Sequence, residues 1–170
     1  MARPARNANA KEILSSSRTF FVSTKTSLGR ALLQSKPHAN LLIDVMRSYA
    51  AAKKFTIHDF VVMPDHVHLL MTLDGTMSIE KAVQLIKGGY SYRVKKELGY
   101  RGEIWQRGFS EVRVDDRASF LAHREYIDQN PVKAGLARAP DEFPYSSAHL
   151  RKQKRAGAKA RILKRFLRHG

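Results

Sequence analysis

Two strand-like segments separated by only two residues constrain the fold of this chain more than any other feature of its sequence. Residues 55–63 (FTIHDFVVM) and 66–73 (HVHLLMTL) are rich in apolar, β-branched and aromatic residues, and Pro64-Asp65 lies between them. A proline followed by an acidic residue between two such runs indicates a turn. The sequence therefore predicts a β-hairpin at its centre.

Further strands and helices are expected on both sides of this hairpin. Residues 18–27 (RTFFVSTKTS) and 108–114 (GFSEVRV) have the composition of strands. The first helix is expected after Pro37, over residues 38–54, with an apolar stripe formed by Leu41, Val45, Tyr49 and Ala52.

The second helix is expected to begin at a Ser78 cap and to stop at Gly99. Gly88-Gly89 in its middle should weaken it. Its apolar stripe is Ile79, Val83, Ile86, Tyr90, Val94 and Leu98. A third helix should begin at Asp115 or Asp116 and end before Pro131.

The order strand, helix, strand, strand, helix, strand, helix predicts an α+β fold. Right-handed crossovers with this order give a ferredoxin-like (RRM-like) split βαβ antiparallel sheet with helices on one face, and the last helix is a C-terminal addition. We expect one domain over residues 18–148, preceded by a flexible segment at 1–17 and followed by a basic tail at 149–170.

The charge of the chain indicates a polyanionic partner. Its formal net charge is +16, from 31 basic and 15 acidic residues, so nucleic acid is the first candidate. Residues 151–170 carry nine Lys or Arg, and no acidic residue follows Phe143. Such a block is stabilised by phosphates, and its first members are possible DNA contacts: Arg151, Lys152, Lys154 and Arg155. Alternatively, the tail is an amphipathic helix that docks on the domain through Ile162, Leu163, Phe166 and Leu167.

The composition also excludes several classes of protein. Without cysteine there is no disulfide, thiolate metal site or cysteine nucleophile, and any metal must use nitrogen and oxygen ligands. No segment has the length of a membrane span, and the N-terminus has no apolar leader. We expect a cytoplasmic, nucleoid-associated protein with no membrane partner.

Two histidines in the second hairpin strand could hold a metal. Side chains alternate along a strand, so His66 and His68 point to one face while Val67, Leu69 and Met71 point to the other. Paired neutral imidazoles suit a divalent cation. Taken alone, however, such a pair is more often satisfied by ordinary hydrogen bonds.

The third helix could complete this site. Tyr126 and Asn130 are four residues apart and project from one helical face. Asn130 could supply an oxygen ligand, with Gln129 as the alternative, and Tyr126 a hydroxyl nucleophile. The alternative is that Asn130 caps the helix and Tyr126 only packs.

Other polar and aromatic residues are weaker candidates. Tyr90 and Tyr92 offer hydroxyls, but Tyr90 lies on an apolar stripe and neither adjoins a candidate ligand. Trp105, Gln106 and Arg107 are possible DNA contacts, although a single Trp is at least as often a core anchor.

Three ordered motifs resemble a known family of enzymes. The segment VVMPDHVHLLMTL (residues 61–73) resembles the one that carries the HUH motif (His, bulky apolar residue, His) in single-tyrosine transposases. IWQRGFSEVRVDD (104–116) and YIDQNPVKAGL (126–136) resemble the later signatures of the REP-associated tyrosine transposases. The matches span approximately residues 18–148.

The resemblance implies a ferredoxin-like, metal-dependent single-strand DNA endonuclease and strand transferase. It implies Mg or Mn as the cofactor, hairpin-containing single-stranded DNA as the substrate, and a 5′-phosphotyrosine on Tyr126. His66, His68 and Asn130 would be the metal ligands, although related insertion-sequence transposases use a glutamine. Both monomers and homodimers occur among such enzymes.

Two other functions are compatible with a basic protein of this architecture. One is a noncatalytic nucleic-acid-binding protein on an RRM-like sheet, but the aromatic signature of that family is missing, since RGFSEVRV departs from it after Phe109. The other is a metal-dependent phosphoesterase that activates water, for which Tyr126 would be incidental.

Overall fold

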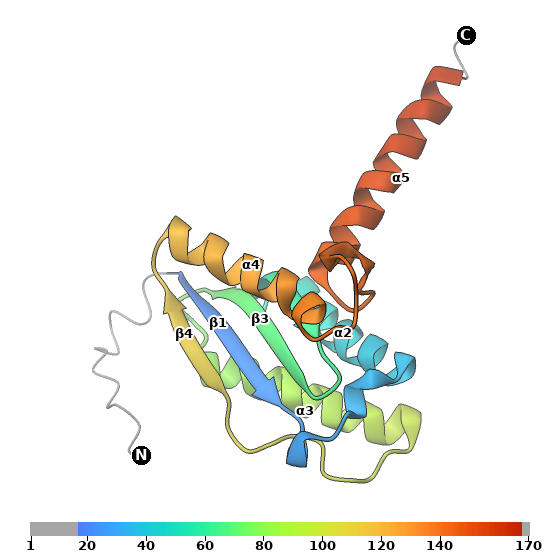
Figure 1. Ribbon diagram of the computed structural model, residues 1–170. Coiled ribbons are helices and arrows are strands. Elements are labelled where there is room, and N and C mark those ends of the chain that lie inside the picture. The colour runs from blue at the N-terminus through green and yellow to red at the C-terminus, as the bar shows by residue number, and fades with distance from the viewer. Residues whose placement is uncertain (1–16, 168–170) are drawn as a thin grey trace.

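The computed structural model describes residues 17–167, apart from the side chains of residues 162, 163, 166 and 167 (Figure 1). The main elements are β1 (Arg18–Lys25), α2 (Lys36–Ala51), β2 (Thr56–Val62), β3 (His66–Leu73), α3 (Ile79–Leu98), β4 (Ser110–Val114), α4 (Arg117–Lys133) and α5 (Ser147–Leu167). Short 3₁₀ turns lie at Ser27–Gly29, Leu32–Gln34 and Pro140–Glu142. The predicted flexible segment, apart from Ser17, lies outside the described residues.

The four strands form one antiparallel sheet in the order β2-β3-β1-β4. The predicted α+β, ferredoxin-like arrangement is therefore confirmed, with β1 and β3 as its central strands. Helices α2 and α3 cover one face of the sheet, and α4 crosses the other (Figure 1). Helix α5 extends away from the sheet.

Strand alternation divides the apolar residues between two cores. Phe20, Val22, Val67, Leu69 and Met71 belong to a large core that the sheet shares with α2 and α3. A smaller cluster lies on the α4 side and contains Val61, Met63, Leu70, Val114, Ile127 and Phe143. His66 and His68 alternate with the residues of the large core, so they belong to the face that α4 crosses, as predicted.

The ends of the first two helices follow local signals, with one exception. Pro37 lies in the first turn of α2, where its missing N–H costs no hydrogen bond. The prediction that Ala52 belongs to the apolar stripe of this helix is wrong, because α2 ends at Ala51 and Lys53 adopts a positive φ of 56°. In α3 the predicted cap is confirmed, since the Ser78 side chain accepts from the Lys81 amide, and Gly99 ends the helix with φ 68°.

The prediction that the third helix ends before Pro131 is wrong. Helix α4 begins at the predicted Asp116 cap, whose side chain accepts from the Ser119 amide, and continues through Pro131 to Lys133. A proline removes one helical hydrogen bond but does not prevent a final turn when burial holds it in place. Ile127 and Pro131 are the buried residues of α4, four positions apart on one face.

Two predicted strands are shorter than expected. The first ends at Lys25, because Ser27–Gly29 forms a 3₁₀ turn. The last begins at Ser110, after Gly108 with φ 78°. None of the helices described within residues 17–167 is long and apolar enough to cross a membrane.

The glycine pair in the middle of α3 has a packing reason at one of its two positions. A Cβ added to Gly89 would lie 2.8 Å from the Tyr49 hydroxyl and 3.2 Å from Val45 Cγ1, both on α2. A Cβ on Gly88 would meet no atom within 4 Å. Glycine at position 89 therefore allows α2 and α3 to approach closely, whereas no close contact requires glycine at position 88.

This difference predicts opposite effects of two alanine substitutions. Gly88→Ala should stabilise the protein by about 0.5–1 kcal/mol, because alanine loses less backbone entropy in a helix than glycine. Gly89→Ala should be destabilising relative to Gly88→Ala by about 1–3 kcal/mol, since its methyl group displaces Tyr49. Urea denaturation of both variants measures the difference, and equal gains in stability would contradict the close approach.

Candidate active site

His66 and His68 form a pair of rings on the sheet face that α4 crosses. Their ring centroids are 4.7 Å apart. A 2.6 Å hydrogen bond joins His68 Nδ1 to Ser23 Oγ, and Ser23 is the direct partner of His68 in the β1–β3 register. A second bond of 2.6 Å joins His66 Nδ1 to the Asp65 carboxylate. Both rings are thus held through Nδ1, which leaves each Nε2 available for another partner.

His68 is neutral at physiological pH. Burial, aided by the charges of His66 and Lys25, lowers its pKa from 6.5 to about 4. Only 7% of its surface is exposed. In the tautomer whose Nδ1 donates to Ser23, the neutral ring presents a lone pair on Nε2, which is the form that a metal ion requires.

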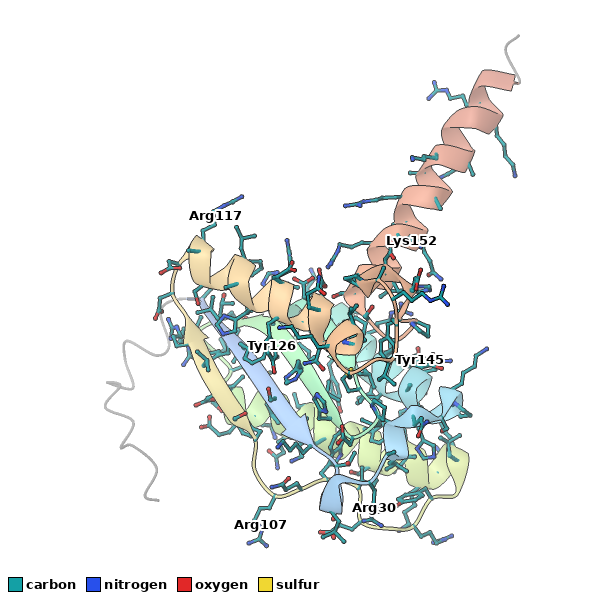
Figure 2. The ribbon with its side chains drawn as sticks, viewed as in Figure 1. Arg30, Arg107, Arg117, Tyr126, Tyr145 and Lys152 are labelled. Carbon is teal, nitrogen blue, oxygen red and sulfur yellow. The ribbon has the colours of Figure 1, made fainter. Side chains whose placement is uncertain are left out.

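Tyr126 projects from α4 over the sheet (Figure 2). Its ring lies 5.3 Å from the His68 ring and 5.6 Å, edge-on, from the ring of Phe21. Tyr126 is 45% exposed, so one side of its ring packs against the sheet while the rest of the side chain is open to solvent. The structure therefore brings the predicted nucleophile and the histidine pair together within one chain.

Asn130 and Gln129 both lie close to the Tyr126 face of α4. An α-helix turns by about 100° per residue, so Asn130 is displaced by about 40° from Tyr126 and Gln129 by about 60° in the opposite sense. Both side chains are half-buried. Within the described part of the chain, no group of three or more His, Cys, Asp or Glu residues is placed to hold a metal ion. A third ligand from Asn130 or Gln129 would be an amide oxygen.

The residues present fit a divalent cation. Two imidazoles oriented through Nδ1 form a nitrogen donor pair, and an amide from the Tyr126 face of α4 would add an oxygen while leaving positions open for substrate and water.

Sequence reasoning missed four residues that shape this site. Ser23 and Asp65 hold the two histidines, and Phe21 stacks on His68 at 5.3 Å and lies 4.7 Å from the ring of His123. His123 donates from Nδ1 to the Ser119 carbonyl at 2.8 Å. The position of Asp65 beside His66 was a usable signal, but the roles of Ser23 and Phe21 depend on the strand register.

The two other candidate tyrosines do not belong to this site. Tyr90 is fully buried in the core and bonds to His38 Nδ1 at 2.8 Å, and burial raises its pKa strongly. Tyr92 is exposed, but it lies on α3, on the opposite face of the sheet.

Trp105 anchors the loop that carries Gln106 and Arg107. Its indole N–H donates to the Lys87 carbonyl at 3.1 Å, and its ring packs on Tyr90. The Lys87 ammonium in turn donates to the carbonyls of Gln106 and Gly108, each at 2.9 Å. Trp105 thus acts as a core anchor.

Gln106 and Arg107 lie beside the end of β1, the strand that separates them from the histidine strand β3. The backbone N–H of Gln106 donates to the carbonyl of Lys25, which pairs with His66 in the sheet. Together with Ser23 and Lys25 these residues line a cleft of about 300 Å³. Arg107 points outward from the body of the protein (Figure 2).

The basic residues at the start of α5 have different surroundings. Arg151 pairs with the carboxylates of Asp59 and Asp128, and Lys152 lies 3.4 Å from Asp141. Lys154 and Arg155 are exposed. A groove of about 580 Å³ between α5 and the Pro140–Glu142 turn is lined in part by Lys152, Arg155 and Lys159. The side chains of Ile162, Leu163, Phe166 and Leu167, which the docking alternative requires, lie outside the described residues.

A ferredoxin-like sheet with a histidine pair on a central strand and a tyrosine on an added helix is the arrangement that the resemblance to single-tyrosine transposases predicts. The sequence pattern of the IS200-like transposases matches residues 22–130. A Haemophilus influenzae protein assigned as a REP-associated tyrosine transposase is 31% identical over 125 residues, which cover 64% of this chain and 71% of the relative. The Escherichia coli REP-associated tyrosine transposase is 30% identical over 98 residues, covering 57% and 56% of the two chains.

The chain belongs to the IS200-like transposase family, among the REP-associated tyrosine transposases. A solved structure of a REP-associated tyrosine transposase bound to a REP hairpin has the same fold, with a TM-score of 0.70 and 24% identity over 88% of this chain and 84% of that one.

Proposed function

We propose that this protein is a metal-dependent endonuclease and strand transferase for hairpin-containing single-stranded DNA, acting through a 5′-phosphotyrosine on Tyr126. The observation that carries the proposal is the contact between the Tyr126 ring and His68 within one chain. That contact also supports a site that one chain completes by itself. The solved relative bound to a REP hairpin supports a hairpin as the substrate.

In the proposed reaction the Tyr126 oxygen attacks a DNA phosphorus, and the bond from phosphorus to the 3′ oxygen breaks. The phenolic proton passes to a base, and the leaving 3′ oxygen takes up a proton. The 5′ phosphate stays on Tyr126, so a free 3′ hydroxyl can later attack it and restore a phosphodiester. Because bond energy is conserved, no nucleotide cofactor is required.

His66, His68 and Asn130, with Gln129 as the alternative, would hold Mg or Mn. A divalent cation bound there would polarise the scissile phosphate and stabilise negative charge in the transition state. Ser23 and Asp65 keep the two imidazoles oriented, and the half-exposed Tyr126 leaves room for a phosphate beside them.

Removing the Tyr126 hydroxyl should abolish the covalent product. Tyr126→Phe keeps the ring that packs on Phe21, so DNA binding should change by less than about twofold while the adduct disappears. The assay uses hairpin-bearing single-stranded oligonucleotides labelled at the 3′ end, with Mn²⁺, followed by denaturing electrophoresis. Tyr92→Phe is the matched control. Adduct formation by Tyr126→Phe at the wild-type rate would exclude this nucleophile, and DNA binding without any wild-type adduct would favour a noncatalytic binding protein.

The histidine pair and one amide should determine metal affinity. His66→Ala and His68→Ala should each abolish detectable Mn²⁺ binding and adduct formation. Asn130→Ala, which removes the proposed amide ligand, should lower the affinity for Mn²⁺ by about 10–100-fold. Calorimetric titration with Mn²⁺ measures this without DNA. His58→Ala is the control for a histidine outside the pair. A larger loss in Gln129→Ala than in Asn130→Ala would transfer the third ligand to Gln129.

The distal part of α5 should bind DNA through phosphates. A chain ending at Arg155 loses Lys159, Arg161, Lys164, Arg165 and Arg168. If these five charges contact single-stranded phosphates, the slope of log affinity against log salt should become shallower by about three to four units. Discrimination between a hairpin and a scrambled strand should change little. An unchanged slope with a lower melting temperature would show instead that the helix docks on the domain.

A further inference from the structure

A fully buried carboxylate lies outside the proposed reaction site and joins three elements. Asp59, in the edge strand β2, has no exposed surface. Its Oδ2 accepts from Arg124 of α4 at 2.7 Å, and its Oδ1 accepts from Arg151 of α5 and from the Ser147 hydroxyl. A buried carboxylate is tolerated only when it is paired in this way, so both arginines are held in defined positions.

Arg151 extends the network to a second point on the tyrosine helix. It donates to Asp128 Oδ2 at 2.5 Å while it pairs with Asp59. Arg124 and Asp128 are one helical turn apart on α4. The helix is therefore connected to β2 directly through Arg124 and, through Arg151 and Asp128, to the base of α5.

These two points lie on the side of α4 away from Tyr126. Positions 124 and 128 are each two residues from 126, which corresponds to about 200° around the helix axis. A rotation of α4 that broke the ion pairs would therefore also move the Tyr126 ring away from His68.

The apolar packing of α4 is limited in extent. Ile127 and Pro131 are its buried residues, Phe120 is partly buried against the same cluster, and the Tyr126 ring lies against Phe21. Dispersion contacts are nondirectional, whereas a guanidinium–carboxylate pair has a preferred geometry. The ion pairs are thus the directional contacts that hold the helix.

We propose that Asp59, Arg124 and Arg151 form a positioning clamp that sets the rotation of α4 and thereby holds Tyr126 over the histidine pair. The clamp rests on the proposed role of Tyr126 as the nucleophile. Arg151 then acts as a positioning residue at the base of α5, and DNA phosphates are left to the exposed basic residues farther along that helix.

Single-turnover adduct formation at saturating hairpin DNA tests the clamp. Arg124→Met and Arg151→Met should each slow the reaction at least tenfold, with the dissociation constant for DNA and the salt slope unchanged. Arg124→Lys should restore part of the rate. The control is Arg93→Met, which removes a partly exposed ion pair with Glu97 within α3, away from the site, and should react at the wild-type rate.

A second measurement follows the helix without using activity. The chain has no cysteine, so Leu121→Cys on α4 and Tyr92→Cys on α3, both exposed, provide two unique sites for spin labels. The distance distribution between the labels should shift or broaden in Arg124→Met and Arg151→Met, and stay unchanged in Arg93→Met. The side chain of Arg124 is 39% exposed, and its loss leaves Asp59 paired with Arg151 and Ser147, so the fold should persist. Melting temperatures confirm this.

The outcomes separate the clamp from the proposed function. Absence of a wild-type adduct overturns the nucleophile, and with it the clamp's role in catalysis. A wild-type adduct with normal rates in both Met variants overturns the clamp alone. A slower rate in the Met variants with an unchanged distance between the labels also overturns the clamp. A salt slope shallower by about 0.7 in Arg151→Met, with a normal rate at saturation, would instead assign Arg151 to a DNA phosphate and overturn its place in the clamp.

Discussion

Strands β1 and β3 lie side by side at the centre of the sheet, and their antiparallel register places Ser23 opposite His68 and Lys25 opposite His66. The orientation of the histidine pair and the protonation state of His68 depend on this register. A slip of one residue would turn both histidines into the large core and bring Val67 to the surface. Because the opposite face of both strands is densely apolar, burial strongly disfavours such a slip.

The two faces of the sheet are covered to different extents, and this difference makes the site possible. Helices α2 and α3 seal one face with a continuous core, while α4 contributes a narrow apolar contact through Ile127. The second face can therefore hold polar side chains beside partly exposed ones. His68 is buried deeply enough to stay neutral, and Tyr126 beside it remains open to solvent.

Because this apolar contact is small, the orientation of α4 also depends on polar contacts, which the Asp59 network provides. The same network joins the start of α5 to the body of the domain, so the boundary expected at residue 149 falls inside a continuous helix that begins at Ser147. The basic helix α5 and the tyrosine helix α4 thus share one buried carboxylate of the edge strand β2.

Local patterns in the sequence were sufficient to predict the hairpin, the shared face of His66 and His68, and the caps at Ser78, Gly99 and Asp116. Alternation and capping depend only on residues a few positions apart. For the same reason, local rules gave the wrong helix end at two places. Burial of Pro131 let α4 continue past the proline, and the chain left α2 before Ala52. The resemblance to single-tyrosine transposases identified Tyr126 among several hydroxyls, and the structure places its ring against His68.

Tertiary structure alone decided which distant residues support the site. Ser23 is 45 positions from His68, and Asp59 is 65 from Arg124 and 92 from Arg151. None of these pairs has a sequence signature, because a serine or an aspartate in a strand has many equally compatible surroundings. In the sequence, Arg151 cannot be distinguished from the other charges of the basic tail. Only the fold places it beside a buried carboxylate. The sequence by itself determined the fold class through short-range periodicity and composition, and its resemblance to a known family named the candidate residues of the site. Their orientation was decided by strand register and helix packing, which only the folded chain defines.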